Sequence, residues 1–363
     1  MSLELVAIGG LVLWLAWCNG ANDVAKGVAT LVGSGESVAR RAVLWGGLWT
    51  VAGGLTAIVW GMALVDTFSR GLLAPGFGVD AIYLVGALAG AGGWVWLATR
   101  FGLPVSTTHA LLGGIAGAAL ALVGPDGLRL SALANKAMLP LLLGPAIAIL
   151  VCWALLLVAR QLARLVPAWR PGCCPQKAWQ KDPFVCALPS EQDSKSLPKP
   201  RRAQFLTRLH WLSSAAVSFG RGLNDAPKIA AFLWLAVSLS PGLPPEGGTM
   251  WPIILVALCM GLGSVWGGYR VLRVLAHRVV PLDHRNGVAA NLTTSGLVLL
   301  ASSLGLPLST THVATGALFG VRLGERHAPP AQDAVKMILF GWLVTLPLAA
   351  LLAAAGSGLL RSL

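Results

Sequence analysis

The sequence has few charged residues. Only 11% of its 363 residues are Asp, Glu, Lys or Arg and 56% are hydrophobic, whereas a soluble domain has about 25% charged residues. The mean hydropathy is +0.73. This composition excludes soluble enzymes, secreted disulfide scaffolds and disordered chains. Several apolar stretches reach about 20 residues, the length of a helix that crosses a bilayer. The sequence therefore predicts an all-α, polytopic membrane protein.

Motifs of common catalytic and metal sites are also missing. The chain contains no HExxH, no GxSxG and no aspartate-rich diphosphate motif, and its six cysteines form no CxxC pair. We therefore expect a protein that is not an enzyme and that holds no cofactor and no structural metal ion.

Acidic residues are scarce, 14 against 27 Lys and Arg, and the formal net charge is +13. The segment from Arg160 to Arg208 holds ten of the basic residues and only three acidic ones. Because Lys and Arg beside membrane spans mark the cytoplasmic face, we interpret residues 160–210 as a solvated cytoplasmic loop. A nucleic-acid or anionic-lipid site is the alternative use of this loop, and we expect no nucleic-acid partner.

The sequence repeats itself on either side of this loop. The octet at 102–109 recurs at 305–312 with seven of eight positions identical, and Asn22-Asp23-x-x-Lys26 recurs as Asn224-Asp225-x-x-Lys228. The two offsets, 203 and 202 residues, differ by only one residue. We therefore expect two homologous membrane repeats, 1–159 and 211–363, with about ten transmembrane segments in total. Repeats with interrupted helices at matching positions are typical of secondary transporters.

The distribution of positive charge predicts the orientation. Five crossings in each repeat would turn the second repeat upside down relative to the first. With the central loop in the cytoplasm and both termini outside, twenty Lys and Arg lie inside and four outside. We expect inverted repeats in a multi-pass protein of the plasma (inner) membrane. The number of spans changes if the Ser-Thr-Thr-His segments are re-entrant hairpins.

Two Asn-Asp pairs interrupt apolar segments, where an Asp at a helix centre costs about 2.5–3.5 kcal/mol. They are Asn22 with Asp23 and Asn224 with Asp225. Neighbouring glycines would let the helices unwind there, so that freed carbonyls, Asn oxygens and carboxylates surround a small cation such as Na⁺. A structural polar clamp between helices is the alternative.

Two Ser-Thr-Thr runs follow Pro104 and Pro307 and precede apolar, glycine-rich stretches. This order is typical of a helix start, and the N–H groups of a helix start attract anions. Two such starts that face each other could surround a tetrahedral oxyanion. The candidate donors are Ser106, Thr107, Thr108, Ser309, Thr310 and Thr311.

Basic side chains accompany both motifs. His109 and His312 are interpreted first as packed, hydrogen-bonded residues, with anion contact or a proton relay as alternatives. Lys26 and Lys228 follow the aspartates by one helical turn and are expected to pair with them. Contact with the substrate and snorkelling toward an interface are the alternative roles of these lysines.

These motifs resemble those of the inorganic phosphate transporter (PiT) family. The resemblance rests on Gly20-Ala21-Asn22-Asp23-Val24-Ala25, on Gly222-Leu223-Asn224-Asp225 and on both Leu-Pro-x-Ser-Thr-Thr-His elements, and it covers essentially the whole chain. It implies import of inorganic phosphate by Na⁺- or H⁺-coupled symport with alternating access. It also implies that the two Ser-Thr-Thr runs are hairpin tips that line the phosphate site.

Some members of that family carry sulfate, so a sulfate permease is the nearest alternative. An anion channel is another. A membrane enzyme that acts on a phosphorylated lipid through Asp23, Asp225 and the histidines is the alternative from a different class. A homodimer is compatible with the sequence.

The sequence departs from the family pattern at Lys26, where the GANDVAN motif ends in Asn. Fixed ammonium groups one turn from Asp23 and Asp225 would repel a further cation. We therefore expect H⁺ to drive uptake more than Na⁺.

Overall fold

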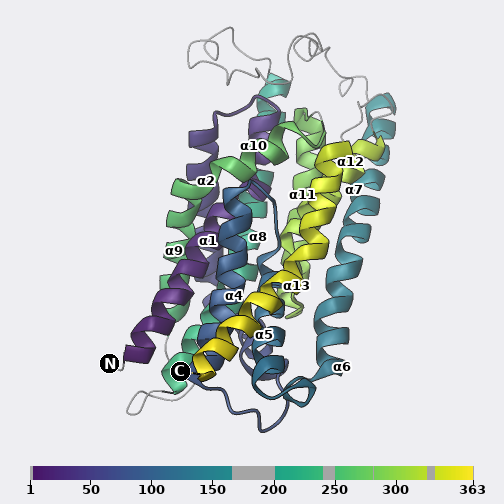
Figure 1. The fold of residues 1–363 in the computed structure, drawn as a ribbon. Coiled ribbons are helices and arrows are strands. Elements are labelled where there is room, and N and C mark those ends of the chain that lie inside the picture. Colours follow the sequence, from purple (N-terminus) through teal and green to yellow (C-terminus); the bar gives the residue numbers. More distant parts are fainter. Residues whose placement is uncertain (1–2, 166–200, 240–249, 281, 325–331, 363) are drawn as a thin grey trace.

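The structure is a helical bundle. The computed structural model describes residues 3–165, 201–239, 250–280, 282–324 and 332–362, and all named elements in these ranges are helices (Figure 1). Most of the basic segment 160–210 lies outside the described residues. The longer helices are α1 (Leu3–Gly33), α2 (Ala39–Trp60), α4 (Ala81–Arg100), α5 (Thr107–Leu122), α7 (Leu139–Leu165), α8 (Arg201–Ser238), α9 (Trp251–Gly267), α11 (His284–Ser303), α12 (Thr310–Gly324) and α13 (Gln332–Ser362). The shorter ones are α3 (Met62–Asp66), η1 (Thr67–Gly71), η2 (Pro125–Gly127), α6 (Leu130–Ala132), η3 (Leu133–Met138) and α10 (Tyr269–His277).

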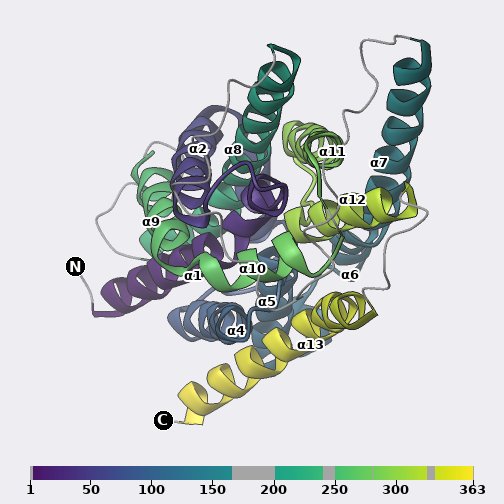
Figure 2. The same ribbon diagram turned by 90° about the horizontal axis from the view of Figure 1, so that it is seen from above.

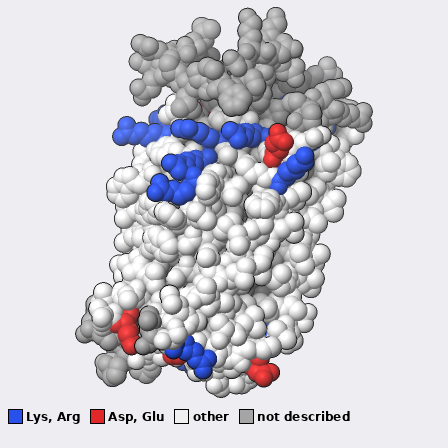
Figure 3. All heavy atoms as spheres, in the orientation of Figure 1, with Lys and Arg blue, Asp and Glu red and all other residues white. Residues whose placement is uncertain are grey.

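The helices run between two ends of the molecule. Both termini lie at one end, here called the terminal end, where α1 and α4 begin (Figure 1). The other end, where α2, α8 and α11 begin, is called the basic end, because Lys and Arg of the visible face gather there (Figure 3). Helices α1 and α8 therefore run in opposite directions.

Fewer helices could cross a membrane than the ten segments expected from the sequence. In the described ranges five are long and apolar enough, or six if the bent pair α9–α10 counts as one span. The apolar stretches near 104–123 and 307–321 form α5 and α12, with only 16 and 15 residues. A helix needs about 20 residues to span the hydrocarbon core, so these two do not cross it.

Each of these two short helices forms a hairpin with the long helix that precedes it. Helix α4 rises from the terminal end and is followed by α5, which descends to the same end, while α11 and α12 form the corresponding hairpin from the basic end (Figure 1). The long helices of the two hairpins, α4 and α11, end in the same way. The φ angles of Gly102 and Gly305 are 70° and 65°, a left-handed conformation that glycine adopts without steric cost and that closes the last turn. In both hairpins the N–H of the next residue donates a hydrogen bond to a carbonyl of the helix, from Leu103 to Ala98 and from Leu306 to Ala301.

The helices that carry the Asn-Asp pairs are continuous, which corrects the expectation that they unwind. Residues 19–23 lie within α1, and residues 220–225 lie within α8. Their glycines serve close packing instead. A Cβ on Gly20 would collide with the backbone carbonyl of Met260 in α9, and one on Gly222 with that of Thr50 in α2. Glycine is required there because two helix backbones approach each other.

The two halves of the chain interleave. Helix α13 packs on α4 and α5, and α7 packs on α11 and α12 (Figure 2). Helix α2 packs on α8, and α1 packs on α9. The last helix of each half thus covers the hairpin of the other half from outside, and α1 and α8 lie side by side between the hairpins. This arrangement encloses the polar residues of α1, α8 and both hairpin tips.

Candidate oxyanion site at the meeting of the hairpin tips

The two hairpin tips touch in the interior. Ser106 and Ser309 each accept a hydrogen bond from the backbone N–H three residues later, at 3.1 and 3.2 Å, and so cap α5 and α12. The Ser309 hydroxyl donates to the Ser106 hydroxyl at 2.8 Å. Both side chains are buried. The N-termini of the two short helices therefore face each other across one hydrogen bond.

The neighbouring threonines hold the tips together. The Thr108 hydroxyl donates to the Leu308 carbonyl at 3.4 Å, and the Thr311 hydroxyl donates to the Val105 carbonyl at 2.7 Å. These two contacts are repeat equivalents, since both pairs are related by the 203-residue offset. Thr107 accepts from the Asn19 amide at 3.0 Å, and Thr310 is buried at the start of α12. All six predicted donors thus lie in one buried region.

The two motif asparagines hold the hairpin backbones. The Asn22 amide donates to the Leu103 carbonyl and to the Thr99 hydroxyl, both at 2.9 Å, and its oxygen accepts from the Val105 N–H. Asn224 donates to the Leu308 carbonyl at 3.0 Å. These are the contacts of a polar clamp, the alternative interpretation of these residues. The freed carbonyls of the expected cation cage are absent from α1 and α8, because both helices are unbroken through these residues.

Both lysines pair with the aspartate one turn earlier. Lys26 forms an ion pair with Asp23, and Lys228 lies 3.3 Å from Asp225. The ammonium groups also donate to the hairpin tips, Lys26 to the Val105 carbonyl at 3.3 Å and Lys228 to the Thr108 hydroxyl at 2.9 Å. Both lysines are buried, so neither snorkels to an interface.

Asn19 joins the site without having been assigned a role from the sequence, and the buried Arg221 lies beside it. The Asn19 amide lies within hydrogen-bond distance of Asp23 (3.2 Å) and Asp225 (3.3 Å), and it thereby links α1 to α8. Arg221 donates to Thr50 and to Ser264. The spacing of Asn19 in the sequence could have indicated this role, because a residue four positions before Asp23 lies on the same face of the helix.

The buried region carries more basic than acidic side chains. Lys26, Arg221 and Lys228 are basic, whereas Asp23 and Asp225 are acidic, so the formal charge is three minus two, or +1. Charges in a desolvated interior interact strongly. An anion at the hairpin tips would therefore experience net positive surroundings, in addition to the two helix N-termini.

The histidines are packed. The rings of His109 and His312 stack with centroids 4.4 Å apart, and His312 also stacks on Trp342 at 4.2 Å. The Nδ1 atom of His312 lies 2.7 Å from the Ser309 hydroxyl. Both rings are packed, as first interpreted, but only His312 makes a side-chain hydrogen-bond contact, which is to a tip. The Nδ1 atom of His109 is buried without a hydrogen-bond partner among the described residues.

Comparisons with known proteins agree with the motifs. A family model described as "Phosphate transporter family" matches residues 19–353. A probable low-affinity inorganic phosphate transporter of Mycobacterium bovis is 29% identical over 351 residues, which cover 94% of this chain and 74% of the relative. A relative of the same description from Rhizobium meliloti is 28% identical over 353 residues, with 96% and 94% covered. A solved structure described as "The sodium-dependent phosphate transporter" is similar with a TM-score of 0.82 and 25% identity, and all of both chains is covered.

Proposed function

The chain belongs to the phosphate transporter family, and from that premise we propose that it is a secondary active transporter that imports inorganic phosphate by cation-coupled symport. The chain is a multi-pass membrane protein and not an enzyme, so the lipid-modifying alternative is discarded. The substrate-binding residues are Ser106, Thr107, Thr108, Ser309, Thr310 and Thr311.

One observation carries the proposal: the buried contact between Ser106 and Ser309 brings two helix N-termini to one point. Aligned N–H groups at each N-terminus and the hydroxyls beside them are donors suited to oxyanion oxygens. Lys26, Lys228 and Arg221 supply the excess positive charge nearby. Because the two tips belong to different hairpins, their separation can change without unfolding either helix, as alternating access around one site requires.

Asp23 and Asp225 favour phosphate over sulfate as the substrate. Phosphate near neutral pH retains a proton and can donate a hydrogen bond to a carboxylate, whereas sulfate has no proton to donate. A desolvated sulfate beside these acceptors would meet repulsion without a compensating hydrogen bond. The carboxylates that pair with Lys26 and Lys228 thus make the site more selective for the protonated anion.

Protons are the proposed coupling ion. The ammonium of Lys26 contacts the Asp23 carboxylate, a position that a sodium ion bound to that carboxylate would need. Two unit charges about 6 Å apart repel by roughly 3 kcal/mol at an effective dielectric of about 20, which weakens a sodium site more than a hundredfold. The similar solved structure is described as sodium-dependent, so coupling is the property in which this chain is proposed to differ.

The proposed orientation places the basic end in the cytoplasm and the protein in the plasma (inner) membrane. Repeats 1–159 and 211–363 would then be inverted with respect to each other. The opposite directions of α1 and α8 and the gathering of Lys and Arg at the basic end support this orientation (Figures 1 and 3).

Purified protein in sealed liposomes tests the proposal. With an inward pH gradient, labelled phosphate should accumulate above its external concentration, and a tenfold excess of sulfate should leave uptake largely unchanged. Flux that stops at equal concentrations would indicate an anion channel. Uptake that sulfate abolishes would indicate a sulfate permease.

A further inference from the structure

A cavity of about 390 Å³ opens at the terminal end of the molecule, where α8 ends and α4 begins (Figure 1). It lies between Arg70 of η1, Arg129 just before α6, and Leu235 and Ser238 near the end of α8. A single water molecule needs only about 10–15 Å³ of such space. The cavity therefore has room for a phosphate ion together with part of its water shell.

The backbone holds the two arginine-bearing segments together at this cavity. Leu73, three residues after Arg70, forms an antiparallel bridge with Leu128. The N–H of Arg129 donates to the Leu72 carbonyl at 3.0 Å. Because these contacts use main-chain atoms, both arginine side chains stay available to the cavity while their backbones are fixed to each other.

The described walls of the cavity carry positive charge only. Two arginines line it, and none of the described lining residues is acidic; the acidic residues nearest in sequence, Asp66, Asp80 and Asp126, are not part of the wall. Only four Lys and Arg of the sequence fall outside in the proposed orientation, and two of them, Arg70 and Arg129, meet here. A cleft lined by one sign of charge concentrates ions of the opposite sign, and guanidinium groups match the oxygens of a phosphate group.

Two elements connect this cavity with the central site. The ring centroid of Phe68 in η1 lies 6.0 Å from the Lys228 ammonium, and Arg70 lines the cavity two residues later. Helix α8 makes the second connection, because Leu235 of the cavity wall follows Lys228 by seven residues, or about 10 Å along the helix axis. The cavity thus adjoins the side of the central site that contains Lys228.

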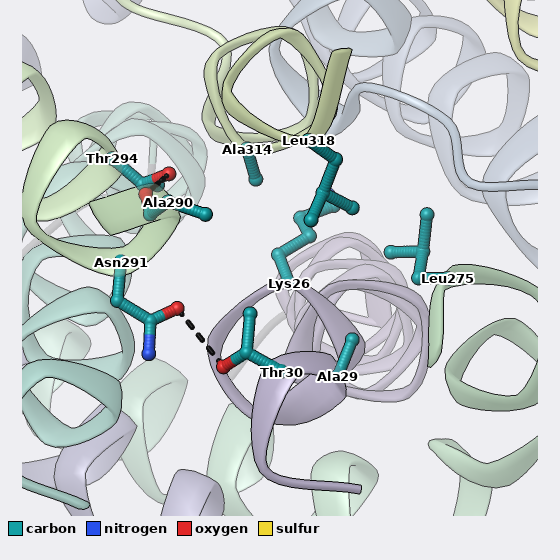
Figure 4. Close-up of a pocket in the computed structure, with 9 residues that line it drawn as sticks. All are labelled: Lys26, Ala29, Thr30, Leu275, Ala290, Asn291, Thr294, Ala314 and Leu318. Atoms are coloured by element: carbon teal, nitrogen blue, oxygen red, sulfur yellow. Dashed lines mark hydrogen bonds between the residues drawn. The ribbon is translucent and has the colours of Figure 1, made fainter. Parts of the chain in front are cut away.

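The space beside the other lysine of the central site is much smaller. Figure 4 shows the pocket next to Lys26, whose walls include Thr30 of α1 and Asn291 of α11. Its volume of about 10 Å³ admits at most one water molecule, and the Thr30 hydroxyl already donates to the Asn291 oxygen at 3.1 Å. Of these two spaces, only the cavity at the terminal end can hold a phosphate ion.

We propose that this cavity is an outer capture site, at which Arg70 and Arg129 bind a free phosphate ion before it passes to the hairpin tips. The ligand is recognised as an oxyanion, a chemistry that a lipid phosphate head group shares. Phe68 is buried in this conformation, so the ion reaches the tips only after η1 moves away from α8. Binding by exposed arginines is weak and is screened by salt. This inference rests on the proposed function.

Thiol labelling tests the charge of the cavity without transport. In a background without native cysteines, Ser238→Cys on the cavity wall should react several-fold faster with a negatively charged reagent than with a positively charged one, each rate being taken relative to a free thiol in solution. Combining Arg70→Gln with Arg129→Gln should bring this ratio close to one, whereas Arg70→Lys with Arg129→Lys should retain it. Leu3→Cys, exposed at the same end, is the control and should show no such preference.

Protection by phosphate identifies the ligand. In vesicles of neutral phosphatidylcholine, inorganic phosphate should slow the labelling of Ser238→Cys but not that of Leu3→Cys. Protection by added phosphatidylglycerol but not by inorganic phosphate would show that the cavity holds a lipid head group, and capture of free phosphate would be wrong. The same reagent ratio in the unmodified cavity and in the double glutamine variant would also overturn the proposal.

Uptake measurements test the consequence for transport. At low ionic strength the double glutamine variant should have a KM for phosphate about three- to tenfold higher, and the difference should shrink at high salt. Arg361→Gln removes another exposed charge at this end and should leave the KM unchanged. An unchanged KM in the double glutamine variant at low ionic strength would contradict capture. Absence of phosphate uptake by the unmodified protein would instead contradict the proposed function, and labelling with phosphate protection would still decide whether the cavity binds phosphate.

Discussion

At the scale of single residues, the tip hydroxyls are expected to set the affinity for phosphate. Thr107→Ala, Ser106→Ala or Ser309→Ala removes a donor to a desolvated anion, which costs about 1.5–3 kcal/mol. The KM for phosphate uptake should therefore rise roughly 10- to 100-fold. Thr107→Ser keeps the hydroxyl and serves as the matched control. Unchanged KM values in all three alanine variants would show that the substrate binds elsewhere.

Lys26 is the residue at which coupling is expected to change. Lys26→Asn restores the residue of the family motif and removes the ammonium that pairs with Asp23. Uptake driven by a sodium gradient should increase relative to uptake driven by a pH gradient, each imposed separately on proteoliposomes. Arg40→Asn, at the start of α2, removes an exposed charge far from the site and should leave the ratio unchanged. Strict sodium dependence of the unmodified protein, with no response to pH, would refute proton coupling.

At the scale of helices, close backbone packing is expected to make two glycines important for stability, Gly20 in α1 and Gly222 in α8. Gly20→Ala places a methyl group against the Met260 carbonyl, and Gly222→Ala places one against the Thr50 carbonyl. Such overpacking typically costs about 1–3 kcal/mol, so the thermal unfolding midpoint of the purified protein should fall. Gly10→Ala in the same helix α1 meets no atom within 4 Å and should not lower it. Equal midpoints for Gly20→Ala and Gly10→Ala would contradict this role.

The hairpin starts could be predicted from the sequence, but the continuity of α1 and α8 could not. Pro104 with Ser106, and Pro307 with Ser309, are local signals, and the caps form where those signals predict them. Gly20 and Gly222 are compatible both with an unwound helix and with a close contact between two helices. Only the structure, which places the backbone carbonyl of another helix against each glycine, shows that the close contact is the reason. The contact between Ser106 and Ser309 depends on how two hairpins meet across 203 residues. The repeat indicated that the two serines are equivalent, but not that they touch.

At the scale of the whole molecule, the charge distribution predicts which end faces the cytoplasm. In a background without native cysteines, Asp126→Cys in the exposed turn η2 should react with an impermeant thiol reagent added to intact cells. Ser34→Cys, between α1 and α2 at the basic end, should react only after the membrane is opened. The reverse pattern would show that the basic end faces the outside.

The central claim about the whole molecule is that the two hairpin tips together form a single phosphate site. Equilibrium binding of labelled phosphate to the purified protein tests this claim most directly, because it needs neither a gradient nor an orientation. The unmodified protein should bind phosphate saturably, and the double variant Ser106→Ala with Ser309→Ala should bind at least about tenfold more weakly. Thr67→Ala removes a partly exposed hydroxyl of η1 that donates to the Ala63 carbonyl one turn earlier, and this variant should bind like the unmodified protein. Full affinity in the double variant would contradict the site.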